Sequence, residues 1–148
     1  MKRLRNYFVM LTVAIMALFC TSCGGNDDSE ELGPFVEYTE ADTFYETYMS
    51  YKGTKALIDT REKSMFEAGH LSGAVNIPAD IYNTADDNAQ WSQDLLAAYP
   101  TNTCLFFYGT TSFQMTKAVA GRASKLGYGK ANSRIYSKGY DALKSVWK

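Results

Sequence analysis

The sequence is poor in the residues that build metal sites and disulfide frameworks. Its 148 residues include one histidine, His70, and three cysteines, of which Cys20 and Cys23 lie close to the N-terminus. One histidine cannot supply the several nitrogen ligands of a histidine-based metal site. Cys104 alone cannot form a disulfide within the rest of the chain. We therefore expect no metal, no cofactor, and a domain that is stabilised by its core.

Positive charge is also scarce. The chain has 15 lysines and arginines against 16 aspartates and glutamates. Three of the basic residues, Lys2, Arg3 and Arg5, lie within residues 1–22, which contain no acidic residue, so removal of that segment leaves 12 basic and 16 acidic residues. The resulting net charge of −4 argues against a nucleic-acid partner, because nucleic-acid binders carry clustered lysine and arginine.

The first 22 residues have the pattern of an export signal. A basic start precedes an apolar run over residues 8–19, and small residues stand just before Cys23. The run is short for a membrane-spanning helix and fits the hydrophobic region of a signal peptide. The segment resembles a bacterial lipoprotein signal peptide over residues 1–22, which implies cleavage and a lipid on Cys23. An ordinary signal peptide cut nearby and an uncleaved anchor are the alternatives.

Residues 24–34, GGNDDSEELGP, are small, polar and acidic, which is typical of a solvated linker. We expect residues 23–36 to form the lipidated cysteine with an acidic flexible tether, and residues 37–148 to form one folded domain. Short acidic runs after a lipidated cysteine also resemble the surface-export signal of Bacteroidetes lipoproteins. The resemblance implies a lipid-anchored outer-membrane protein at the cell envelope, on the periplasmic side or on the cell surface.

Patterns of helix and strand alternate along the rest of the chain. The apolar run TCLFFY is typical of a central parallel strand that is covered on both faces. Alternation of this kind predicts a three-layer α/β/α fold around a mostly parallel sheet of about five strands. Strands are expected at residues 55–59, 74–77, 103–108 and 133–136, and helices at 38–51, 64–68, 89–99, 114–126 and 140–147.

Residues 56–78, ALIDTREKSMFEAGHLSGAVNIP, resemble the front half of a rhodanese domain. The family pattern is aspartate-x-arginine followed by phenylalanine-x-x-glycine-histidine and a glycine-alanine turn. The closing segment, with Ser137-Lys138-Gly139-Tyr140, also resembles the family, so the resemblance covers residues 38–148 and implies a rhodanese-like fold. It further implies a motif that borders the site or is structural, made of Asp59, Arg61, Gly69, His70 and Gly73. Met65 stands where the family usually has a glutamate.

The resemblance also identifies where the chemistry of the family is expected. Rhodaneses carry a sulfur atom as a persulfide on a cysteine after the central strand, ahead of a basic residue at the head of a helix. Here Gly109 stands at the cysteine position and Gln114 at the basic one. The resemblance therefore implies no catalytic residue, and a non-catalytic binding or interaction module, a pseudoenzyme of the sulfurtransferase family.

The loop could still bind a small anion, or a carboxylate of a protein partner, through helix-start N–H groups and hydroxyls. The plainer interpretation is that these residues cap the helix. The candidate loop comprises Gly109, Thr110, Thr111, Ser112, Phe113 and Gln114.

Two catalytic alternatives remain open at this point. The first is an active thiosulfate-type sulfurtransferase with its persulfide on Cys104. That thiol lies five residues before Gly109, roughly 16 Å away along a strand, and a buried thiol is usually unreactive. The second is a phosphatase of the cell-cycle type, which resembles this fold but needs the same cysteine and an arginine in the loop.

Overall fold

The structure is a computed structural model, and it describes residues 32–80, 89–110 and 113–148. The predicted signal peptide, Cys23 and most of the tether lie outside the described residues. Residues 31–148 form one compact unit. In the part of the chain that the structure describes, no helix is both long enough and apolar enough to cross a membrane.

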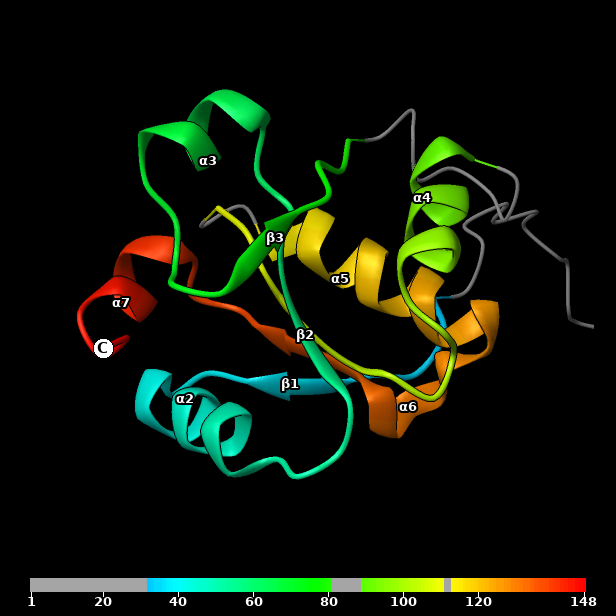
Figure 1. Cartoon of the computed structure of the whole chain (residues 1–148), viewed down its shortest axis with the longest axis horizontal. Coiled ribbons are helices and arrows are strands. Elements are labelled where there is room, and N and C mark those ends of the chain that lie inside the picture. Colours follow the sequence, from blue (N-terminus) through cyan, green and yellow to red (C-terminus); the bar gives the residue numbers. More distant parts are fainter. Residues whose placement is uncertain (1–31, 81–88, 111–112) are drawn as a thin grey trace, which may run out of the picture. The chain divides into compact units, whose positions relative to one another are not determined.

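A five-stranded parallel sheet forms the centre of the domain, which confirms the predicted fold class (Figure 1). The strands lie in the order β1-β5-β4-β2-β3. Every strand therefore presents its carboxyl end at the same edge of the sheet. The strands are β1 (Val36–Tyr38), β2 (Lys55–Asp59), β3 (Ala74–Asn76), β4 (Cys104–Tyr108) and β5 (Ser133–Tyr136).

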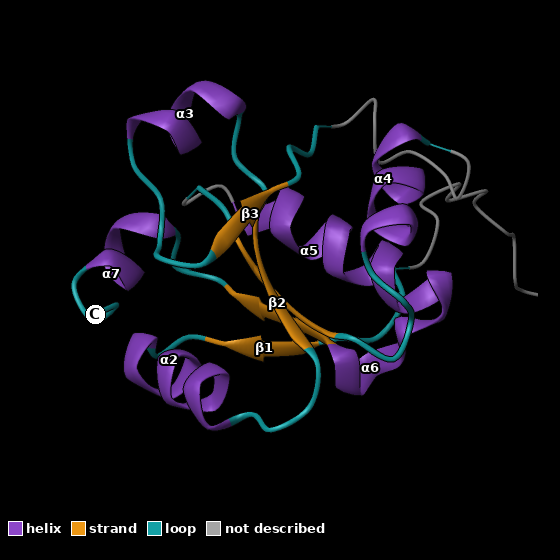
Figure 2. Cartoon of the chain, viewed as in Figure 1, coloured by secondary structure: helices purple, strands orange, loops and turns teal. Residues whose placement is uncertain are grey.

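Helices cover both faces of the sheet (Figure 2). Helices α2 (Ala41–Ser50) and α7 (Tyr140–Lys144) lie on one face, and α4 (Gln90–Ala98) and α5 (Phe113–Ala123) lie on the other. Helix α3 (Lys63–Ala68) links β2 to β3. After α5 the chain continues through a π-helical turn, η1 (Ser124–Tyr128), and the short helix α6 (Gly129–Asn132) before it enters β5.

The two cores divide the side chains of β4 between them. Leu105 and Phe107 point to the α4 and α5 side, and Phe106 and Tyr108 point to the α2 and α7 side. All five residues of the strand are buried. This alternation explains the continuous apolar run, because a central parallel strand must be apolar on both faces.

The first described residues pack against the domain. Strand β1 at Val36–Tyr38 was not expected, and Leu32 and Gly33 already lie against α5. The approach is close: a Cβ on Gly33 would lie 2.6 Å from the carbonyl oxygen of Gly121. Glycine at both positions allows this contact. Strand β1 supplies the fifth strand of the sheet.

Candidate binding site at the carboxyl end of the sheet

The ends of three neighbouring strands are level with one another. Asp59, the last residue of β2, pairs in register with Tyr108 of β4 and with Asn76 of β3. The pairing continues beyond the sheet, where the backbone N–H of Thr60 donates to the carbonyl of Tyr108 at 3.0 Å. The segments that follow these strands are thus held side by side at the edge where ligands bind in parallel α/β sheets.

A buried ion pair fixes the turn after β2. The Nη2 of Arg61 lies 2.6 Å from Oδ2 of Asp59, and the Nε of Arg61 donates to both carboxylate oxygens. Burial opposes the charge of the guanidinium, but the hydrogen bonds and the charge of Asp59 outweigh burial, so the pKa of Arg61 is raised above its ordinary value. The ion-pair partner of Arg61 is therefore the neighbouring Asp59.

Arg61 contacts three further segments, two through its guanidinium and one through its backbone carbonyl. Its Nη2 also donates to the carbonyl of Gly69 at 2.7 Å, and its central carbon lies 3.8 Å from the ring centroid of Tyr140. The side chain of Asn76 donates to the carbonyls of Asp59 and Arg61. Arg61 is only 8% exposed. These contacts lock the side chain in one orientation, with its planar group stacked on an aromatic ring.

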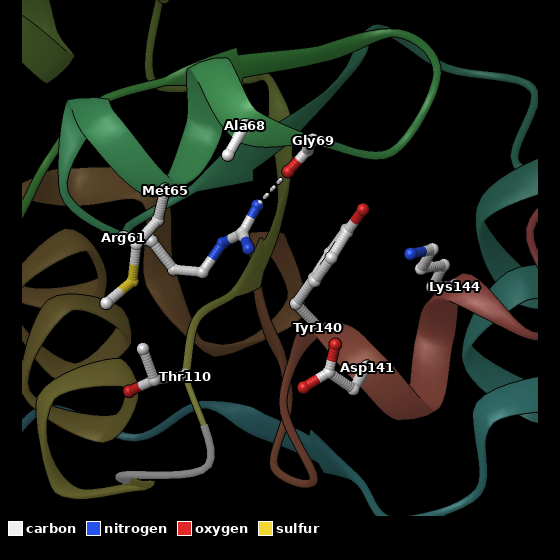
Figure 3. A pocket seen from close by; sticks show the side chains of 8 residues that line it. All are labelled: Arg61, Met65, Ala68, Gly69, Thr110, Tyr140, Asp141 and Lys144. Atoms are coloured by element: carbon white, nitrogen blue, oxygen red, sulfur yellow. Dashed lines mark hydrogen bonds between the residues drawn. The ribbon is translucent and has the colours of Figure 1, made fainter.

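Two adjoining hollows open at this edge, and Arg61, Met65 and Thr110 line both. The larger hollow encloses about 400 Å³ between α3 and α7, and Figure 3 shows the ring of Tyr140 between Arg61 and Lys144. The smaller encloses about 290 Å³. Both approach the size of ordinary small-ligand pockets. The larger is further lined by Ala68, Gly69, Tyr140, Asp141 and Lys144, the smaller by Thr60, Glu62, Ala79, Asp80, Met115 and Thr116.

Gly109 directly follows β4 and is buried in contact with the smaller hollow's wall. Its carbonyl accepts a hydrogen bond from the N–H of Tyr140 at 2.9 Å. A Cβ at this position would lie 2.7 Å from Oγ1 of Thr116 and 2.8 Å from Oγ1 of Thr60. These distances are shorter than the contacts that Cβ atoms make in real structures. Two threonine hydroxyls therefore occupy the space that any side chain on residue 109 would need first.

The rest of the candidate loop is only partly described. Thr110 lines both hollows, Phe113 begins α5, and Gln114 is exposed. Thr111 and Ser112 lie outside the described residues. The structure therefore places Thr110 at the hollows and leaves the predicted set of loop donors incomplete.

The other motif residues shape the surroundings. Gly69 lines the larger hollow and supplies the carbonyl that Arg61 contacts. Gly73 has φ +82°, a left-handed conformation that favours glycine. His70 is exposed, and its ring stacks on Phe66 at 3.9 Å with Nδ1 3.0 Å from the carbonyl of Phe66. The histidine lines neither hollow.

Cys104 is the first residue of β4 and lies at the opposite end of the strand from Gly109. Its side chain is fully buried. Burial raises the pKa of the thiol, although the charge of Arg134 acts in the opposite direction. Within the described residues, no group of three or more His, Cys, Asp or Glu side chains is arranged to hold a metal ion.

Comparison with known families gives a clear assignment. A model described as "Rhodanese-like domain" matches residues 41–145. The chain belongs to the rhodanese-like domain family. The match includes β2, the Asp59–Arg61 turn, Gly109 and Tyr140, so it spans the whole site.

Solved structures share the fold of this rhodanese-like domain. An uncharacterized protein from Saccharomyces cerevisiae matches with 19% identity and a TM-score of 0.56, over 76% of this chain and 92% of that one. The rhodanese-like domain of an Anabaena sp. protein matches with 16% identity and a TM-score of 0.54, over 78% of this chain and 76% of that one. A human single-domain sulfurtransferase matches with 21% identity and a TM-score of 0.50, over 76% of this chain and 96% of that one. A search of curated proteins gives no match.

Several residues that line the hollows belong to no sequence motif, so they could not be identified from the sequence. Met65 is 44% exposed and borders both hollows, and Thr116 lies on the first turns of α5. Tyr140 was expected only as part of the closing segment. The one available signal for Met65 was its position where the family has a glutamate. The contacts of Thr60 and Thr116 with Gly109 depend on tertiary structure.

Proposed function

We propose that this rhodanese-like domain is a non-catalytic binding module. The observation that carries the proposal is the environment of Gly109, which stands where the family resemblance expects the cysteine. The absence of the cysteine by itself requires only one substitution and says nothing about the residues around it. The hydroxyls of Thr60 and Thr116, 2.8 and 2.7 Å from a would-be Cβ, suggest that the surroundings have adapted to glycine. Because a persulfide needs a side chain at this point, the packing supports a role in binding.

The position of Cys104 weighs against the catalytic alternative. A sulfur carrier must exist as a thiolate and meet its substrate. Cys104 is fully buried, its pKa is raised, and it lies at the end of β4 remote from both hollows. A persulfide there would have no route to the site.

A thiosulfate:cyanide sulfurtransferase assay tests the proposal. The chain beginning at residue 23 with Cys23→Ser, which retains the whole described domain, should show no turnover above buffer. Mass spectrometry after thiosulfate treatment should show no adduct of about 32 Da, the mass of one sulfur atom, on Cys104. Turnover that Cys104→Ser abolishes would instead establish the sulfurtransferase.

The anchoring is part of the same proposal. We propose that residues 1–22 are a lipoprotein signal peptide of Bacteroidetes type and that a lipid on Cys23 holds the domain at the cell envelope. The described chain enters at Leu32 and Gly33, ahead of the amino end of β1, whereas the hollows lie at the carboxyl ends of the strands. In a parallel sheet these are opposite edges.

A further inference from the structure

We draw no further inference here: the strongest candidate, the larger hollow between α3 and α7 that Arg61, Tyr140 and Lys144 line, belongs to the site already described, and no contact among the described residues shows which kind of ligand would fill it.

Discussion

The guanidinium carbon of Arg61 lies 3.8 Å from the centroid of the Tyr140 ring, a contact that joins the end of β2 to the start of α7. The backbone N–H of Tyr140 donates to Gly109, which extends the connection to β4. One residue of α7 thus contacts both the buried ion pair and the position where the family chemistry is expected. The stability of the site and its shape are therefore coupled through Tyr140.

Replacement of Tyr140 by leucine should lower the free energy of unfolding by about 1–2 kcal/mol, because the guanidinium of Arg61 loses its aromatic face. Tyr140→Phe should cost less, since the ring is retained. Urea unfolding monitored by circular dichroism measures both. Equal losses in the two variants would show that the hydroxyl, and not the stacked ring, stabilises this contact.

Substitution of Gly109 by alanine should destabilise the domain by about 1–3 kcal/mol, the range for overpacking. The added Cβ meets the hydroxyls of Thr60 and Thr116. In a background with Thr60→Ala and Thr116→Ala the same substitution should cost less than about 1 kcal/mol, because both contacting oxygens are gone.

Urea unfolding of these four chains gives the coupling free energy. A cost that is the same in both backgrounds would mean that the threonines do not exclude a side chain at residue 109. The cycle also bears on Gly109→Cys, which should yield a well-packed thiol only in the double-alanine background.

Much of the architecture could be predicted from local patterns. The apolar run of β4 and the strand at residues 55–59 are confirmed because a central parallel strand has little freedom in composition. Strand β1 was not predicted because it is only three residues long, Val36–Tyr38. It lies at the edge of the sheet, where its side chains are at most partly buried, so its hydrophobic pattern is weak. The helix expected over residues 114–126 is α-helical to Ala123 and continues as the π-helical turn η1 from Ser124, in which Gly127 takes φ +107°.

The site was less accessible to sequence reasoning. The turn at Asp59 and Arg61 carries a recognisable pattern, and the ion pair forms within it. The wall around Gly109 does not, because Thr60 and Thr116 come from separate segments and only the fold brings their hydroxyls together. The lining of the smaller hollow likewise combines residues from separate segments, which only the fold brings together.

Stability should fall in alkaline solution, in part through Tyr128. Burial, and to a smaller extent the neighbouring Tyr99, raise the pKa of Tyr128 to about 12 from an ordinary value of 10.0. A raised pKa means that the folded state holds the proton more tightly, so this stabilisation is complete below pH 10 and is lost as pH rises from about 10 to 12. The shift corresponds to about 3 kcal/mol at most.

Tyr128→Phe isolates this contribution. The hydroxyl donates to the carbonyl of Tyr99 at 2.7 Å, so the variant should be less stable at pH 8 by about 1 kcal/mol. Its free energy of unfolding should then fall less steeply between pH 10 and pH 12. Urea unfolding at several pH values checks the slopes, and parallel profiles for the two chains would contradict the assignment to Tyr128.

Attachment to the membrane should depend on Cys23 and not on Cys20. If the lipid is carried by Cys23, then Cys23→Ser should move the protein from the carbonate-washed membrane fraction to the soluble or uncleaved fraction, because one or more acyl chains provide the anchor. Cys20→Ser is the matched control: it removes a thiol three residues away, within the segment that would be discarded, and should leave palmitate labelling and membrane retention intact. Retention of both variants with an uncleaved N-terminus would favour an apolar anchor. Release of both would favour an ordinary signal peptide, and the domain would then meet its partners without a tether.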